Sequence, residues 1–145
     1  MRVEQTLYEY PYIKQRIRDI QREMGEVQVS MSAVYDGLCC PLSRFGEAPS
    51  TTGRAGDPTG QAALLICDTL DDRYDRLRVE VKRLSAIIDG MDAALLELSE
   101  VEKSVIEYRY FQRKRGREIA ERLGCTRQNV FYHQRQALEK LGRDY

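Results

Sequence analysis

The side chains of this 145-residue sequence best suited to chemistry lie in its last third. Arg127 and Gln128 are followed at helical spacing by Arg135, and arginine and glutamine carry the groups that pair with guanine and adenine edges in the major groove of DNA. Four cations precede them, which either contact backbone phosphates or form a solvated face: Arg113, Lys114, Arg115 and Arg117. The chemistry predicted is therefore the binding of duplex DNA.

The distribution of charge supports this prediction. The whole chain carries 23 cations and 23 anions, and its net charge of zero alone argues against non-specific binding of nucleic acid. From residue 112 onward, however, nine Lys and Arg face four Asp and Glu, so this segment carries +5 and the remainder −5. A basic C-terminal unit on an acidic remainder indicates that one end meets an anion while the other has a different task.

Three short helices are predicted to position these side chains. Ser99 and Glu102 have the S-x-x-E spacing of a capping box, which predicts a helix that begins there and runs to about Phe111. A second helix is expected over residues 118–123. The third helix and its junction with the second carry the most specific spacing in the chain.

The junction between the last two helices has helix-turn-helix spacing. Gly124 can adopt a positive φ in the turn, Ala120 is small where the helices cross, and Thr126 is the predicted N-cap of a final helix that reaches Leu141. The positions expected to be buried are Ile119, Leu123, Val130 and Leu138.

The final helix is predicted to enter the major groove with its first turn and its outward positions. Phe131 either contacts a thymine methyl group or packs on a neighbouring helix, and His133 is expected to be partly buried. The DNA-binding set predicted at this helix is Thr126, Arg127, Gln128, Asn129, Phe131, Tyr132 and Arg135.

Two runs of apolar residues at alternating steps of three and four precede this unit, which is the heptad spacing of long helices. The first run is Tyr10, Ile13, Ile17, Ile20, Met24, Val27, Met31 and Val34. The second run is Ala63, Cys67, Leu70, Tyr74, Leu77, Val81, Leu84, Ile88, Met91 and Leu95. Pro11 suits the first turn of its helix. The two helices are expected to pack as an antiparallel hairpin, as a seam between two subunits, or as both.

We therefore predict an all-α protein: a long antiparallel, coiled-coil-like helical hairpin followed by a helix-turn-helix domain. The predicted divisions are a heptad helix at residues 1–36, a flexible Ser/Thr/Gly/Pro-rich loop at 37–58, a second heptad helix at 59–96 and the DNA-binding domain at 97–145.

Other classes of function lack their residues in this sequence. Neither a C-x-x-C pair nor a phosphate-binding loop pattern is present, so no metal, cofactor or small-molecule substrate is expected. No nucleophile–base pair has recognisable spacing, so we expect no catalytic residue and no enzyme. The absence of a long apolar run and the charged N-terminus argue against membrane insertion or export. A cytoplasmic location with reduced thiols at Cys39, Cys40, Cys67 and Cys125 is predicted.

The stretch LSEVEKSVIEYRYFQRKRGREIAERLGCTRQNVFYHQRQALEKL resembles region 4 of sigma-70-type factors. The resemblance implies that Arg127, Gln128, Phe131 and Tyr132 occupy base-reading and phosphate-touching positions. The two aromatic residues depart from the more polar sigma pattern, which puts a carry-over of the sigma target sequence in doubt. The long helices do not resemble the promoter-opening region 2 of sigma factors.

The plan of the whole chain, with its YPYIKQRI start and a loop ending in DPTG, is similar to the phage ArpU/RinA group of late-gene transcriptional regulators. This similarity implies activation of phage genes from a promoter-proximal DNA site. Two alternatives remain open: the DNA-recognition subunit of a phage terminase, and a sigma-like adaptor that binds RNA polymerase. Double-stranded DNA is the expected partner, and RNA polymerase and a second copy of the chain are further candidates.

Overall fold

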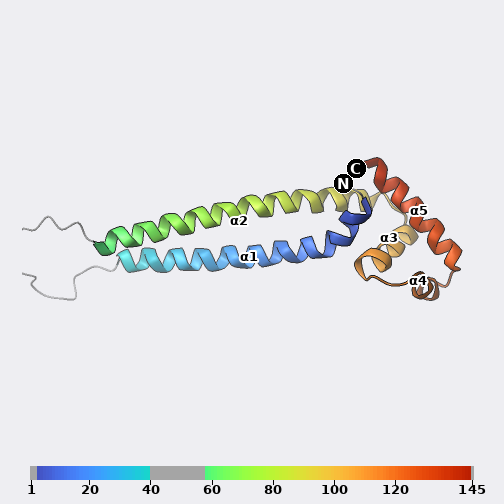
Figure 1. The fold of residues 1–145 in the computed structure, drawn as a ribbon, viewed down its shortest axis with the longest axis horizontal. Coiled ribbons are helices and arrows are strands. Elements are labelled where there is room, and N and C mark those ends of the chain that lie inside the picture. Colours follow the sequence, from blue (N-terminus) through green and yellow to red (C-terminus); the bar gives the residue numbers. More distant parts are fainter. Residues whose placement is uncertain (1–2, 40–57, 145) are drawn as a thin grey trace, which may run out of the picture. The chain divides into compact units, whose positions relative to one another are not determined.

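The structure, a computed structural model, describes residues 3–39 and 58–144, and within these ranges every regular element is a helix (Figure 1). Two long helices come first, α1 (Val3–Cys39) and α2 (Pro58–Leu96). The shorter elements that follow are α3 (Glu100–Ile106), the π-helical turn η1 (Glu107–Phe111), α4 (Gly116–Leu123) and α5 (Arg127–Asp144). The predicted all-α class is confirmed in these ranges. Most of the predicted loop at 37–58 lies outside the described residues.

The chain divides into two compact units, one formed by the residues up to Arg18 together with those from Arg83 onward, the other by Asp19–Lys82. None of the helices in the described ranges combines the length and apolar character needed to cross a membrane.

In the unit 19–82, α1 and α2 run antiparallel. Glu23 of α1 forms an ion pair with Arg73 of α2, and further along α1 the hydroxyl of Tyr35 interacts with Cys67, which lies earlier in α2. The heptad residues of this unit are all buried or half-buried, because an apolar stripe that faces a partner helix is removed from water. The most buried of them are Ile20, Val27, Cys67 and Leu77.

In the other unit, the start of α1 packs against the end of α2. The Tyr10 hydroxyl donates a hydrogen bond to Asp92, and Lys14 Nζ lies 3.7 Å from Asp92 Oδ1 and 4.4 Å from the centre of the Tyr10 ring. The buried apolar side chains around this cluster are Leu7, Tyr10, Ile13, Leu84, Ile88 and Met91. The predicted antiparallel pairing of two long helices ahead of a helix-turn-helix-like domain is therefore confirmed.

The position of Pro11 differs from the prediction. Pro11 lies inside α1, because the helix already begins at Val3. Proline has no N–H to donate to the carbonyl of Leu7, and its ring bends the helix at this point. Figure 1 shows the dark-blue start of α1 turned away from the direction of the helix that follows. The buried Leu7 continues the apolar spacing back toward the N-terminus, so the earlier start could have been predicted.

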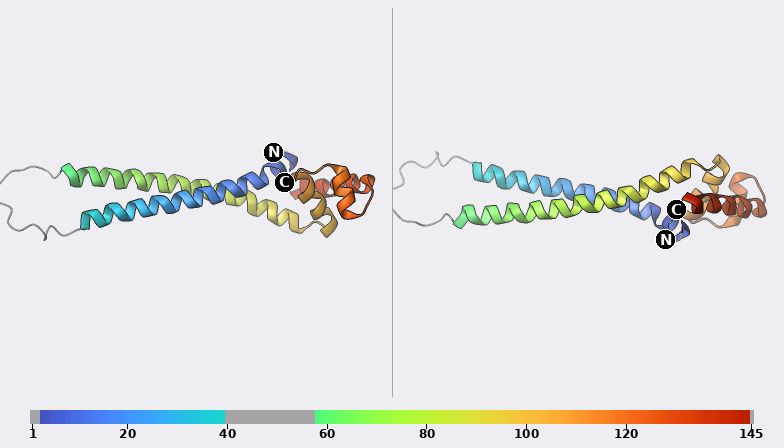
Figure 2. Two further views of the ribbon diagram at one scale, coloured as in Figure 1. Left: turned by 90° about the horizontal axis from the view of Figure 1, so that it is seen from below. Right: turned by 90° about the horizontal axis from the view of Figure 1, so that it is seen from above.

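Helices α3 and α4 both pack against α5 (Figure 2). Their shared core consists of Val105, Ile119, Ala120 and Val130, with Tyr108, Leu123 and Cys125 packed against it. The predicted capping box is present, because Ser99 N–H donates to Glu102 Oε2 at 2.9 Å and Glu102 N–H donates to Ser99 Oγ at 3.4 Å.

The helix predicted to run to about Phe111 does end there, but its last five residues form a π-helical turn. The N–H of Gln112 donates to the carbonyl of Glu107 at 2.9 Å, five residues earlier. Such turns are rare and shift the faces of the residues that follow them. Arg113, two residues after the end of η1, has φ +55°, a left-handed conformation that is uncommon for a residue with a side chain.

Candidate nucleic-acid interface

The corner between α4 and α5 has the local geometry that the sequence predicts. Gly124 adopts φ 63° and ψ 33°, and the N–H of Cys125 donates to the carbonyl of Ala120 at 3.0 Å. Thr126 Oγ1 accepts the N–H of Asn129 at 3.2 Å, so Thr126 is the N-cap of α5. A left-handed glycine followed by a capped helix turns the chain sharply, which sets α5 across α4.

Helix α4 begins at Gly116, two residues before its predicted start. Glu118 Oε2 accepts the N–H of Arg115 at 3.0 Å, which is one half of a capping box. The other half is missing, since an arginine side chain has no oxygen to accept from the first turn. The positive guanidinium of Arg115 therefore stands free beside the start of α4.

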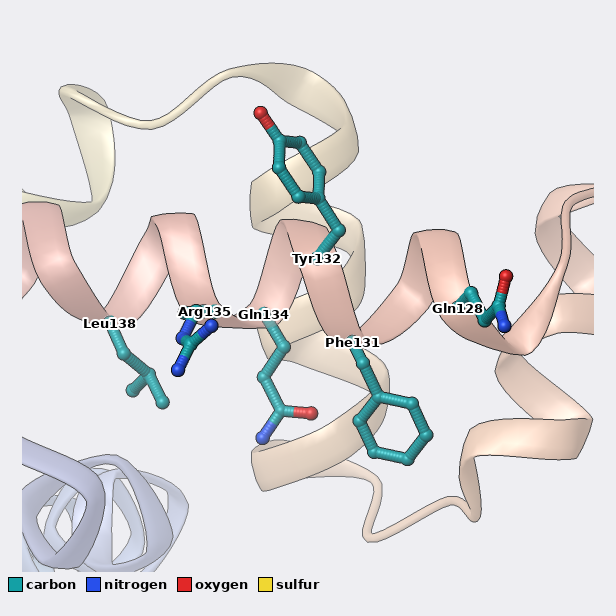
Figure 3. A pocket seen from close by; sticks show the side chains of 6 residues that line it. All are labelled: Gln128, Phe131, Tyr132, Gln134, Arg135 and Leu138. Carbon is teal, nitrogen blue, oxygen red and sulfur yellow. The ribbon is translucent and has the colours of Figure 1, made fainter.

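One face of α5, which we call the recognition helix, is open to solvent. Val130, Ala137 and Leu141 are buried on its inner side, whereas the outer side lines a groove of about 530 Å³ (Figure 3). A helix has 3.6 residues per turn, so Gln128, Phe131 and Arg135 fall on one stripe. The groove-lining residues are Gln128, Phe131, Tyr132, Gln134, Arg135 and Leu138.

The ring of Phe131 packs on a neighbouring helix, one of the two roles that the sequence left open, and also keeps an exposed surface. A Cβ placed on Gly116 would lie 3.7 Å from Phe131 Cζ, so the ring rests against the start of α4. At the same time Phe131 is 50% exposed. Tyr132 is 60% exposed and leaves the helix on the opposite side from Phe131 (Figure 3). Its ring meets the edge of His133, which is half-buried as predicted.

The predicted basic residues fall into two groups. Lys114 and Arg117 are engaged: Lys114 Nζ lies 5.3 Å from the centre of the Tyr108 ring, and Arg117 Nε lies 3.3 Å from Glu121 Oε1. The other four side chains are exposed, and none of them forms an ion pair with another described residue: Arg113, Arg115, Arg127 and Arg135. These four guanidinium groups are the ones free to meet an anion.

Two members of the predicted set do not line the groove. Thr126 commits its side-chain oxygen to the cap of α5. Asn129 is exposed but does not line the groove, since the helical step of about 100° per residue turns it away from Gln128. The structure thus brings together Gln128, Phe131, Tyr132 and Arg135, with Arg127 in the first turn.

Sequence reasoning missed the residues that join this domain to the start of α1. Tyr110 is 2% exposed, its hydroxyl donates to Glu4 Oε1 at 3.2 Å, and it accepts from Gln134 Nε2 at 3.0 Å. The Tyr8 ring meets the Tyr110 ring edge-on with centres 4.8 Å apart. The tyrosine-rich segments YEYPY and YRYF were the only signal, and nothing in their spacing pairs one with the other.

A second aromatic pair, this one stacked, joins the same two segments. The rings of Tyr10 and Phe111 are nearly parallel, at 16°, with centres 4.6 Å apart.

Burial raises the pKa of Tyr110 to about 12, and the nearby charge of Glu4 acts in the same direction, while the hydrogen bond from Gln134 opposes it. The Tyr110 hydroxyl therefore keeps its proton at neutral pH and remains a donor to Glu4.

The three-helix core, the tight glycine turn and the exposed second helix of the corner define a helix-turn-helix domain, a class of fold that binds DNA. Residues 88–141 match the family model for Sigma-70, region 4. The match begins within α2 and ends within α5, so it includes the capping box, η1 and the corner. It supports DNA binding and transcription regulation as the class of function. Comparisons with curated proteins and with solved structures gave no match.

Proposed function

We propose that this chain is a sequence-specific DNA-binding regulator of transcription, and that it activates late genes of a phage or prophage from a promoter-proximal site. The observation that carries the DNA-binding part is the exposed face of α5, where Gln128, Phe131 and Arg135 line one groove. The phage role is supported by the similarity of the chain's plan to the ArpU/RinA group.

The positions of the free arginines suit two kinds of contact with DNA, one to base edges and one to backbone phosphates. Arg127 lies in the first turn of the recognition helix, from which a side chain can reach base edges in the major groove. Arg113 and Arg115 precede α4 and are suited to backbone phosphates, contacts that position a protein without reading sequence. We propose binding without a catalytic step. RNA polymerase is proposed as a second partner on the strength of the region 4 match.

A second copy of the chain is also proposed as a partner, through the long helices. Several heptad side chains of α1 are only half-buried, among them Ile17, Met24 and Met31. Pairing of two copies would cover them and would place two recognition helices on two half-sites. Sedimentation of the full chain with and without DNA tests this, and a strict monomer in both conditions would contradict it.

A matched pair of variants distinguishes the effect of a charge within the heptad packing from the effect of a charge on the exposed surface of α2. Leu77 is 8% exposed and Val79 is 67% exposed on the same helix. Leu77→Asp buries a charge and should destabilise the hairpin strongly, whereas Val79→Asp should leave it folded. If two copies pair through the packed face, Leu77→Asp should also lower the affinity for a two-site duplex.

The experiment that tests the proposed function is recovery of the genomic DNA fragments bound by the full protein, followed by titration of the enriched duplex against a scrambled one at several salt concentrations. Enrichment of a promoter-proximal site with preference over the scrambled duplex supports the regulator. Enrichment of a packaging origin would favour the terminase subunit. Absence of duplex binding even at low salt, where electrostatic attraction is strongest, would overturn the proposal and favour the adaptor.

A further inference from the structure

The hydroxyl of Tyr110 is shared by two elements that are far apart in the sequence. Glu4 comes from the first turn of α1, and Gln134 comes from the recognition helix. Tyr110 donates to the first and accepts from the second, at 3.2 and 3.0 Å. The tyrosine itself is almost fully buried, whereas Glu4 is exposed and Gln134 is half-buried, so the bonds run from the interior of the domain to its surface.

The residue at the end of this chain of hydrogen bonds belongs to the groove. Gln134 lines it together with Phe131 and Arg135, the neighbours of Gln134 on the same helix. Figure 3 shows Gln134 and Phe131 pointing to the same side of α5. The amide of Gln134 is therefore tied at its nitrogen to Tyr110 while the side chain borders the surface on which the proposed function depends.

We propose that Tyr110 is a positioning residue for the recognition helix, and that the first turn of α1, through Glu4, is a functional part of the DNA-binding domain. The inference rests on the proposed function. It assigns a role in DNA recognition to a segment outside the region that matches Sigma-70, region 4.

The physical reason is the cost of an unsatisfied buried polar group. A rotation or slide of α5 that separated Gln134 from Tyr110 would leave the hydroxyl oxygen of the buried Tyr110 without the N–H that it accepts. Tyr110 is itself fixed by its edge contact with Tyr8 and by the stack of Tyr10 on the adjacent Phe111. The π-helical turn brings Tyr110 and Phe111, consecutive residues, into contact with α1 together. The ring contacts thus fix the Tyr110 hydroxyl, and the hydrogen bond from Gln134 ties α5 to that fixed point.

The test uses the full chain and the enriched duplex. Tyr110→Phe removes only the hydroxyl, and we expect the affinity for the preferred duplex to fall roughly 2- to 10-fold, the range for the one hydrogen bond that this hydroxyl makes to α5. Affinity for a scrambled duplex and the salt dependence should be unchanged, because the free arginines are retained. Tyr12→Phe is the matched control, since Tyr12 is 72% exposed on the same helix as Glu4. All titrations are made well below the melting temperature of the least stable variant.

A second pair of variants separates positioning from charge. Glu4→Gln and Glu4→Leu both remove the negative charge, but only glutamine keeps an oxygen that can accept the Tyr110 proton. We expect Glu4→Gln to bind the preferred duplex like the wild type, and Glu4→Leu to resemble Tyr110→Phe. The side-chain amide signals of Gln134 in ¹⁵N NMR spectra should shift in Tyr110→Phe and Glu4→Leu and remain in place in Glu4→Gln.

The outcomes distinguish this inference from the function on which it rests. A wild-type protein that binds no duplex would overturn the proposed function. A wild-type protein that binds its duplex, with Tyr110→Phe and Glu4→Leu binding equally well, would overturn only the positioning role. Equal proportional losses on the preferred and scrambled duplexes would also overturn it, because they would indicate a general loss of folded protein.

Discussion

Lys140 Nζ lies 2.8 Å from Glu102 Oε2, which joins the later turns of the recognition helix to the capping box at the start of α3. The side chain of Glu102 is 7% exposed, and that of Lys140 is 43% exposed. Burial by itself would raise the pKa of Glu102, but the hydrogen bonds from Lys140 and from Ser99 outweigh it and the pKa is lowered. The domain therefore keeps a charged carboxylate at the junction of two helices.

The first prediction concerns this carboxylate. Glu102→Gln keeps the shape of the side chain but removes its charge, and it should destabilise the protein by about 1 kcal/mol near neutral pH, a modest value because Lys140 is partly solvated. Because the pKa of Glu102 is lower in the folded state than in the unfolded state, its charge stabilises the folded protein at pH values above the unfolded pKa of about 4.3. This stabilisation is lost as the pH falls through the folded pKa. Urea unfolding should show the difference from wild type shrinking in acid. Glu100→Gln, at an exposed carboxylate of the same helix, is the control.

The second prediction uses the raised pKa of Tyr110. Absorbance titration of the nine tyrosines should contain a late step at about pH 12 that disappears in Tyr110→Phe. Because the folded pKa lies above the unfolded value of about 10, the resulting stabilisation is fully present below pH 10 and is lost as the pH rises toward 12. Wild type should therefore lose stability relative to Tyr110→Phe over this interval. An identical titration in both proteins would contradict the burial of this hydroxyl.

The third prediction concerns the turn glycine. Gly124 has φ +63° with no heavy atom near its missing Cβ, so Gly124→Ala should cost about 1–2 kcal/mol through backbone strain alone. Gly142 also has open space around its missing Cβ, but it lies within α5. Gly142→Ala should stabilise the helix by up to about 1 kcal/mol. Thermal unfolding of the two variants should move in opposite directions, and equal shifts would show that the strain at Gly124 is not the cause.

The fourth prediction compares two free arginines. Arg127→Ala should cost about 1–3 kcal/mol against the preferred duplex and little against a scrambled one, because bidentate bonds to a base form only where that base is present. Arg115→Ala should weaken both complexes and make the salt dependence shallower by about one counterion. Arg76→Ala, at an exposed arginine of α2 outside the helix-turn-helix domain, is the control. Equal losses on both duplexes for Arg127→Ala would indicate that a different face of α5 enters the major groove of the DNA.

Much of the fold follows from spacing in the sequence. The capping box at Ser99, the left-handed Gly124 and the cap at Thr126 depend on bonds between residues three to five positions apart. Such bonds are determined by residue types at short separation. The heptad residues are likewise buried or half-buried in the described helices, because a repeat of three and four places them on one face whatever the partner is. Which of the predicted residues contact DNA remains a prediction.

The contacts that join the helices of the helix-turn-helix domain to one another and to the start of α1 are visible only in the tertiary structure. Tyr110 contacts residues 106 and 24 positions away, and Lys140 is 38 positions from Glu102. No spacing in the sequence predicts such pairs, because they form only once the helices have packed and have brought polar groups together in a site with little water. The same holds for Lys114, which follows η1 and whose Nζ lies 5.3 Å from the centre of the Tyr108 ring, whereas the ion pair of Arg117 with Glu121 joins residues four positions apart on one helix. Residue types determined which groups could bind DNA, and packing determined which of them are available to do so.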